Sequence, residues 1–150
     1  MITRARRSAR RRADDTATEP LPRRLLLDTH AWLWWQTDDP KLGPRARRAI
    51  ASASEVRVSA ASAWEIAIKV TLGKLRMPAD IDVEHEIEHG GFLPLPIEIA
   101  HTDALRRLPA LHRDPFDRML IAQAATEGLT LVSADRQLDP YDIPVLDAQT

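Results

Sequence analysis

The chain has 150 residues, of which 44% are hydrophobic, and its formal net charge at neutral pH is -1. This length and composition fit one compact domain with a single core and leave no room for a second domain of typical size. Because the chain contains no cysteine, disulfides, a thiolate nucleophile and zinc sites with cysteine ligands are all excluded.

The small net charge conceals two oppositely charged parts. The first 24 residues contain eight arginines and three acidic residues, whereas the rest of the chain contains 13 basic and 19 acidic residues. The arginine-rich start has no apolar periodicity, and no segment reaches the roughly 20 apolar residues of a membrane span. We expect residues 1–23 to be a disordered extension, either dispensable or able to hold nucleic acid, and residues 24–150 to form the folded domain of a soluble, cytoplasmic protein without membrane contact.

Apolar patterns from Arg24 onward predict alternating strands and helices. In chain order these are a strand at 25–27, helices at 31–36 and 44–52, a strand at 56–59, helices at 60–75 and 80–91, the apolar segment 92–97, helices at 98–108 and 114–128, and strands at 129–133 and 143–146. Strands separated by helices indicate a parallel arrangement. The predicted fold class is α/β: a single domain with a central, mostly parallel sheet flanked by helices on both faces.

Several residues mark where the predicted helices begin and end. Pro44 and Pro115 stand at first helical positions, where the missing N–H is harmless, and Asp114 is a cap before the second of them. Gly73 and Gly128 follow apolar periodic segments and indicate helix ends. In the helix that ends at Gly73 the apolar positions are expected to belong to the core.

Four acidic residues follow predicted strands or lie in helices near strand ends: Asp28, Glu65, Asp117 and Asp135. Singly, an aspartate at such a position can be a helix cap, a favourable charge at a helix start or a turn residue. Glu65 is harder to explain, since "AWEIAI" surrounds it with apolar residues, and a buried glutamate without a partner must lose its charge or bind a cation.

The topology gives these acids a common location. In a parallel sheet the strand ends and the helix starts that follow them share one edge, so the four carboxylates can meet there. Carboxylates gathered at one edge repel one another unless a cation lies among them, and oxygen ligands suit Mg²⁺ or Mn²⁺. Such an ion can bind a phosphate oxygen and activate a water, which favours phosphodiester cleavage.

Five blocks of the sequence resemble the PIN-domain family, specifically the VapC-type toxins of bacterial toxin–antitoxin pairs. They are "LLLDTHAWLWW", "VSAASAWEIAIKVTLGKL", "FLPLPI", "DPFDRMLIAQAATEGLTLVSAD" and "IPVL", and together they span about residues 24–147. The resemblance implies a PIN-like domain and a Mg²⁺- or Mn²⁺-dependent endoribonuclease. It also implies an RNA substrate, a cognate antitoxin that inhibits the enzyme, and a homodimer.

The resemblance also implies roles for particular residues. Matched block by block, the family's metal-binding and catalytic acids correspond to Asp28, Glu65, Asp117 and Asp135. Thr29 and Ser133 look like the hydroxyl residues that orient those acids. The arginine-rich extension has no counterpart in the family pattern. The block "DPFD" contains two aspartates, and we assign the metal to Asp117 because backbone N–H groups should occupy the oxygens of Asp114 at the helix cap.

Other readings of the sequence remain open. "HEIEH" satisfies the zinc-protease pattern through His85, Glu86 and His89, although the segment is acidic and ends at once in two glycines. A non-catalytic RNA-binding PIN-like module is a second alternative. RNA cleavage restored by Mg²⁺ or Mn²⁺, as opposed to casein cleavage restored by zinc or RNA binding without cleavage, separates these functions.

The tryptophans near the start of the domain bear on partners. Trp32 and Trp35 lie about one helical turn apart, whereas Trp34 lies off to the side, so they cannot share one stripe. Either both faces of the helix are buried within the domain, or one forms a groove for an antitoxin helix or a second copy.

Overall fold

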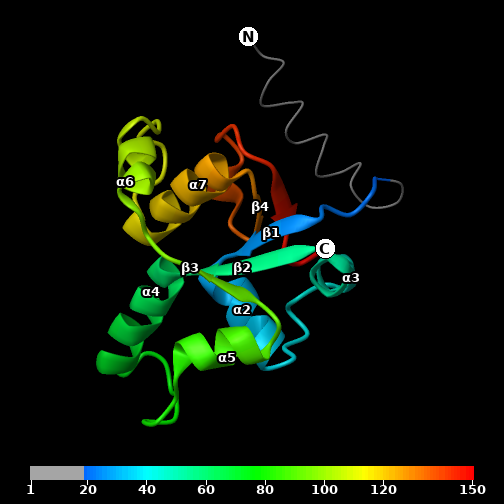
Figure 1. Ribbon diagram of the computed structural model, residues 1–150, viewed down its shortest axis with the longest axis vertical. Coiled ribbons are helices and arrows are strands. Elements are labelled where there is room, and N and C mark those ends of the chain that lie inside the picture. The colour runs from blue at the N-terminus through cyan, green and yellow to red at the C-terminus, as the bar shows by residue number, and fades with distance from the viewer. Residues whose placement is uncertain (1–18) are drawn as a thin grey trace.

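The computed structural model describes residues 19–150, so most of the predicted extension lies outside the described residues. Within that part of the chain, five parallel strands form one sheet in the order β3-β2-β1-β4-β5. Their bounds are β1 Arg24–Leu27, β2 Glu55–Ser59, β3 Leu93–Leu95, β4 Thr130–Ser133 and β5 Val145–Asp147. The sheet has β1 at its centre, and the predicted α/β class is confirmed (Figure 1).

Six α-helices and one short 3-10 helix accompany the sheet in the described residues. Their bounds are α2 Thr29–Gln36, α3 Pro44–Ser52, α4 Ala60–Thr71, α5 Val83–His89, α6 Ile99–Arg106, α7 Pro115–Glu127 and η1 Arg136–Leu138. The predicted start of α3 at Pro44 and the predicted cap of α7 at Asp114 are confirmed. Gly128 ends α7 with φ of 67°, a conformation that glycine adopts without strain. None of these helices combines the length and apolar character that a membrane crossing needs.

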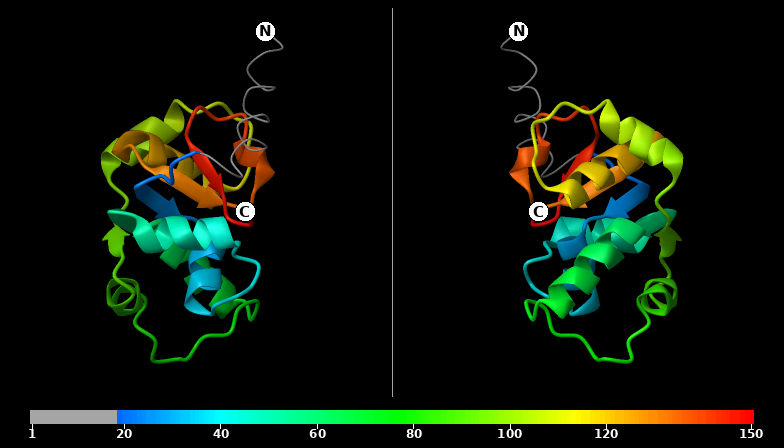
Figure 2. Two further views of the ribbon diagram at one scale, coloured as in Figure 1. Left: turned by 90° about the vertical axis from the view of Figure 1, so that its right-hand side faces the viewer. Right: turned by 90° about the vertical axis from the view of Figure 1, so that its left-hand side faces the viewer.

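Helices cover both faces of the sheet because the side chains of β1 alternate between two cores. Leu25 and Leu27 pack in a cluster that includes Trp32 of α2 and Ile50 of α3. Leu26 points to the other face and packs in a second cluster, where α7 supplies Leu120, Ile121 and Ala124. Figure 2 shows α2, α3 and α5 on one side of the sheet and α6 and α7 on the other. All three leucines of β1 are fully buried.

The order of the strands reverses beside the central strand, β1. After β1 the chain passes to β2 and β3 on one side, and then crosses to β4 and β5 on the other. Open α/β folds bind their ligands where the order of the strands reverses in this way. Asp28 directly follows β1 and Asp135 lies two residues after β4, so both stand at this point.

One expectation about the core is wrong. Trp64, Ile68 and Leu72 of α4 and its C-terminal cap form a stripe that is exposed, with 59%, 37% and 62% of their surfaces accessible. The buried side of α4 is adjacent to this stripe, and it includes Glu65 and Ile66. Helical periodicity identifies the apolar side of a helix, but it does not show that the domain itself covers that side.

The tryptophans of α2 are covered to different degrees. Trp32 is buried, while Trp34 and Trp35 are half-buried and pack against the edge of the core. The ring of Trp35 lies against Phe92, with a centroid distance of 5.8 Å. The domain thus covers much of both apolar faces of this helix.

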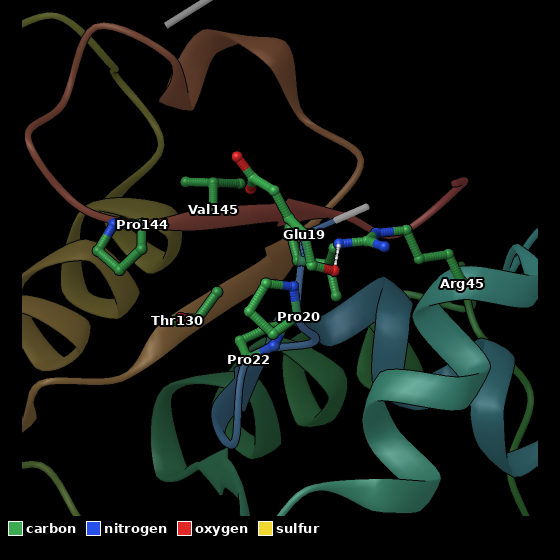
Figure 3. A pocket seen from close by; sticks show the side chains of 8 residues that line it. Glu19, Pro20, Pro22, Arg45, Thr130, Pro144 and Val145 are labelled. Atoms are coloured by element: carbon green, nitrogen blue, oxygen red, sulfur yellow. Dashed lines mark hydrogen bonds between the residues drawn. The ribbon is translucent and has the colours of Figure 1, made fainter. Parts of the chain in front are cut away.

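A cavity of about 160 Å³ lies at the opposite, amino end of the sheet (Figure 3). Its lining includes Pro22, Thr130 and Pro144, which stand before or at the start of β1, β4 and β5. Arg45 of α3 borders the cavity and donates a hydrogen bond from Nη2 to the backbone oxygen of Glu19 at 3.4 Å. The cavity is therefore separate from the acidic residues at the carboxyl ends of the strands.

The residues just before β1 contact the domain. Leu21 packs against the larger core cluster, and the backbone oxygen of Arg23 accepts hydrogen bonds from the backbone N–H and the hydroxyl of Ser54, at 2.8 and 2.9 Å. We therefore propose that the folded unit includes Leu21, a few residues before the boundary expected from the sequence.

Two truncated chains test this boundary. Removing residues 1–18 is expected to change the free energy of unfolding by no more than about 0.5 kcal/mol. Removing residues 1–23 is expected to lower it by about 2 kcal/mol, because apolar burial and backbone hydrogen bonds are lost together. Urea unfolding followed by tryptophan fluorescence measures both, and equal stabilities for the two chains would contradict the boundary.

Candidate active site

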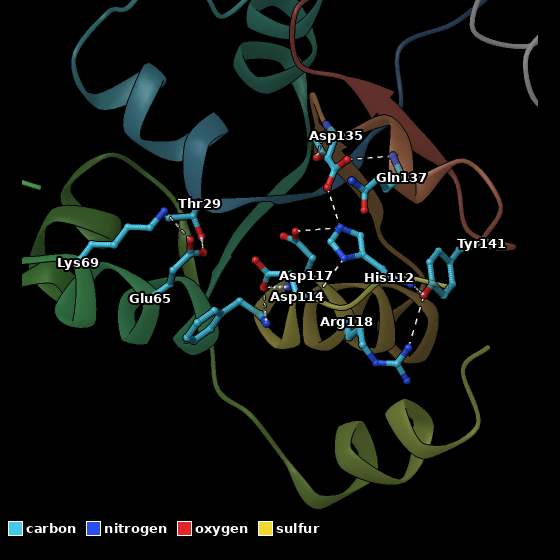
Figure 4. Close-up of polar contacts among 12 residues, drawn as sticks. Thr29, Glu65, Lys69, His112, Asp114, Asp117, Arg118, Asp135, Gln137 and Tyr141 are labelled. Carbon is cyan, nitrogen blue, oxygen red and sulfur yellow. Dashed lines mark hydrogen bonds and ion pairs between the residues drawn. The ribbon is translucent and has the colours of Figure 1, made fainter. Parts of the chain in front are cut away.

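A histidine and two aspartates form the tightest polar cluster at the carboxyl edge of the sheet (Figure 4). His112 Nε2 lies 2.7 Å from Oδ2 of Asp135 and 3.2 Å from Oδ2 of Asp117. His112 is buried and the two aspartates are half-buried. One ligand atom from each of the three side chains falls within 4.8 Å of the others, which is close enough for all three to surround one ion.

The backbone explains how the two aspartates reach this position. Asp117 is the third residue of α7, on the turn that Asp114 and Pro115 begin. Oδ1 of Asp114 accepts the N–H groups of Phe116 at 2.8 Å and of Asp117 at 3.3 Å. The capping role predicted for Asp114 is confirmed, and the Asp117 side chain is left to face the cluster (Figure 4).

His112 was missed by the sequence reasoning. It stands in "LHRDPFD", two residues before the cap, and its Nδ1 accepts the backbone N–H of Asp114 at 3.0 Å. Its contact with Asp135 spans 23 residues and depends on the tertiary fold. The available signal was a histidine directly before a proline-started helix that already carried a candidate acid.

Asp28 lies at the centre of the acidic region. It is only 7% exposed, and its Oδ1 accepts the backbone N–H of Ala31 at 2.8 Å. Burial raises the pKa of the Asp28 carboxyl, with Glu65 contributing in the same direction, although hydrogen bonds from Ser133 and Ala31 oppose the shift. The Ser133 hydroxyl also accepts the backbone N–H of Asp135 at 3.0 Å, so it connects both acids.

Glu65 lies beside this cluster with partners of its own. Its Oε1 accepts a hydrogen bond from the Thr29 hydroxyl at 2.7 Å, and its Oε2 pairs with Lys69 Nζ at 2.8 Å, one turn along α4. The buried Glu65 carboxylate therefore has two partners within the protein. Lys69 balances its charge locally, while Thr29 fixes the direction of the carboxylate.

The electrostatics of Asp117 show how much negative charge gathers here. Burial, together with the charges of Asp114, Asp28 and Asp135, raises the pKa of the Asp117 carboxyl to about 7, and His112 opposes the shift. Close carboxylates that disfavour one another's ionisation form a set of oxygen donors that a divalent cation stabilises. By this chemistry the residues present fit a hard metal ion.

Some other polar side chains do not join this cluster. Arg118, next to Asp117, donates to the backbone oxygens of Pro109 at 2.9 Å and Leu105 at 3.4 Å, so its guanidinium holds a loop. His85 and His89 stack on α5 with a ring centroid distance of 5.8 Å, and both are exposed. Within residues 19–150 they belong to no group of three potential ligands.

Comparison with known proteins adds evidence from outside the structure. The chain matches the model of the PIN domain over residues 25–144. Over 122 residues it is 30% identical to the protein named ribonuclease VapC22 of Mycobacterium tuberculosis, and the match covers 80% of this chain and 93% of that protein.

Three solved structures have a similar fold. The VapBC2 complex of Rickettsia felis, bound to a DNA fragment from its promoter, has a TM-score of 0.63 at 13% identity, covering 81% of this chain and 96% of that chain. FitAcB of Neisseria gonorrhoeae has a TM-score of 0.58 at 18% identity, covering 83% and 97%. A toxin–antitoxin complex of Klebsiella pneumoniae has a TM-score of 0.55 at 15% identity, covering 83% and 97%. At these identities the likeness establishes the fold.

The raised pKa of Asp117 predicts how stability depends on pH in the absence of divalent metal. Folding favours the protonated carboxyl, so its contribution to stability is complete below about pH 4 and is lost as the pH rises through about 7. The shift at Asp28 has the same sign. We expect the free energy of unfolding to fall by about 1–2 kcal/mol between pH 5 and 8, after allowance for solvent screening.

Urea unfolding in chelator at several pH values measures this dependence. Asp117→Asn removes the titrating carboxyl and should make the free energy of unfolding depend less on pH, whereas Asp80→Asn, at an exposed site, should not. If the free energy of unfolding of Asp117→Asn depended on pH as strongly as that of the parent, the charge of this carboxyl would not limit stability.

Proposed function

This chain belongs to the PIN-domain family, and on that basis we propose that it is a metal-dependent endoribonuclease, the VapC-type toxin of a toxin–antitoxin pair. The relative that is 30% identical over most of the chain carries the name ribonuclease, which supports RNA hydrolysis as the activity. The observation that carries the proposal is the convergence of Asp28, Asp117 and Asp135 from separate segments at one edge of the sheet. We assign the protein to the cytoplasm.

We propose that Asp28, Glu65, Asp117 and Asp135 hold Mg²⁺ or Mn²⁺. The support is the set of carboxylate oxygens and the mutual charge effects among these acids. A bound divalent cation would neutralise a phosphate oxygen and make a nearby water more acidic. Without it, the carboxylates would repel the phosphodiester.

The residues of the chain then orient the reacting groups. The carboxylates of Asp117 and Asp135 both lie close to Nε2 of His112, and the Ser133 hydroxyl hydrogen-bonds to Asp28 at the end of β1. In the reaction a water oxygen attacks phosphorus in line with the leaving O3′, the P–O3′ bond breaks, and the products carry a 5′-phosphate and a 3′-hydroxyl. The water gives up one proton, and the leaving oxygen gains one.

We also propose two protein partners, a cognate antitoxin and a second copy of the chain. The structures of similar fold include complexes of toxin with antitoxin, which supports the first partner. The exposed stripe of Trp64, Ile68 and Leu72 gives an apolar surface suited to a protein contact. Light scattering after size exclusion, with the antitoxin absent, tests the dimer.

The two aspartates of "DPFD" give a direct test of the site. Asp117→Asn is expected to lower Mg²⁺- or Mn²⁺-dependent cleavage of single-stranded RNA at least 100-fold, because it removes a carboxylate of the cluster. Asp114→Ala should keep most of the activity and lower the free energy of unfolding by about 1 kcal/mol, because the helix cap is lost. Reversed outcomes would show that the other aspartate serves the reaction.

A double variant tests the two acids on the other side of the cluster. Asp28→Asn with Glu65→Gln should abolish both cleavage and Mn²⁺ binding measured by titration calorimetry, because two oxygen ligands lose their charge. The matched control is Asp80→Asn with Glu84→Gln, two exposed acids outside the cluster, which should behave as the parent does. A double variant that degrades RNA at the parent's rate would refute the nuclease assignment.

A further inference from the structure

We propose that His112 is a positioning residue, which sets the spacing of Asp117 and Asp135 through its Nε2–H group and stays outside the coordination sphere of the metal. The inference rests on the proposed function, because it concerns the same site. The inference goes further than that function because it assigns a role to His112. Judged by distances alone, His112 could also be a metal ligand.

The hydrogen bonds of the imidazole decide between these roles. Nδ1 accepts the backbone N–H of Asp114 at 3.0 Å, so the lone pair of Nδ1 is occupied and this nitrogen carries no proton. In the neutral ring the proton then belongs to Nε2. Nε2 is the nitrogen that faces the carboxylates, and there it acts as a donor without a lone pair to offer a cation.

Nε2 joins two carboxylates that come from different elements. It forms a hydrogen bond with Oδ2 of Asp135 at 2.7 Å and lies 3.2 Å from Oδ2 of Asp117. The other oxygen of Asp135 accepts the backbone N–H of Gln137 at 2.9 Å, which limits the rotation of that carboxylate. His112 therefore holds at a short separation two groups that repel each other.

The loop that carries His112 is itself held in place (Figure 4). The Tyr141 hydroxyl accepts the backbone N–H of His112 at 2.8 Å and donates to the backbone oxygen of Pro109 at 3.0 Å. Arg118 donates to the same Pro109 oxygen at 2.9 Å. Tyr141 is 5% exposed and His112 is 8% exposed, so these bonds are shielded from water. The protein itself therefore fixes the position of the loop and of the imidazole, through the bonds of Tyr141 and Arg118.

A consequence for metal choice follows. If His112 gave a nitrogen ligand beside two carboxylates, the site would suit zinc and other transition metals. With Nε2 protonated, the ligands are oxygens only, and the site favours Mg²⁺ and Mn²⁺. Loss of a side chain that hydrogen-bonds to metal ligands and orients them typically lowers metal affinity 10–100-fold.

Electron spin-echo measurements on the Mn²⁺-loaded full chain distinguish a ligand from a positioning residue. We expect no nitrogen coupling of the size that a directly bound imidazole produces. A strong ¹⁴N coupling that disappears in His112→Gln would overturn the proposal, because it would place the imidazole on the metal. Failure of the wild-type chain to bind Mn²⁺ would overturn it as well.

Substitution gives a second readout that a purely structural role would not produce. His112→Ala is expected to weaken Mn²⁺ binding in calorimetry about 10-fold. His112→Gln, whose amide N–H can reach the place of Nε2–H, should recover most of the affinity. His85→Ala and His85→Gln are matched controls on the exposed face of α5 and should bind Mn²⁺ as the parent does. Thermal unfolding of each variant shows whether the fold persists.

The outcomes separate this inference from the proposed function. If the parent cleaves RNA and His112→Ala binds Mn²⁺ at the parent's affinity, the positioning role is wrong and the nuclease stands. If Mn²⁺ affinity follows the expected order but the parent cleaves no RNA, the positioning role stands and the nuclease is wrong. Equal loss of affinity in the Ala and Gln variants would count against the Nε2–H group as the cause.

Discussion

Repulsion among carboxylates at the carboxyl edge of the sheet is the constraint that organises this molecule. Each acid has a partner that offsets this repulsion. Lys69 pairs with Glu65, the Ser133 hydroxyl hydrogen-bonds to Asp28, and His112 lies close to both Asp117 and Asp135. The remaining repulsion raises the pKa of Asp117 to about 7, together with burial. Such an arrangement lowers stability, and clusters of this kind are typical of functional sites, where a bound cation can offset the repulsion.

The constraint can be met only because the framework around it is apolar and closely packed. The leucines of β1 alternate between two cores, and the strand is hydrogen-bonded to β2 on one side and β4 on the other. Asp28 is therefore attached to the most enclosed part of the sheet. The reversal of strand order beside β1 then brings the starts of α2 and α7 and the end of β4 to one place.

Much of this organisation could be predicted from the sequence, because it depends on local signals. Pro44, Asp114, Pro115 and Gly128 act within a few residues of their own positions, and parallel strand ends must share an edge. Particular side-chain contacts between distant segments could not be predicted. His112 was overlooked because only the fold brings it to Asp135, and the exposure of the Trp64 stripe depends on which elements cover α4. The roles of Asp28, Glu65, Asp117 and Asp135 remain predictions.

The two sides of the acidic region are built differently. Asp28 continues a strand whose backbone is paired along both edges, whereas His112 lies on a loop that is held by the side chains of Tyr141 and Arg118. The acidic region therefore has one side built from backbone hydrogen bonds and one side whose position depends on side-chain hydrogen bonds. A substitution at Tyr141 or Arg118 would remove support from the loop side, whereas the strand side does not depend on any single side chain in this way.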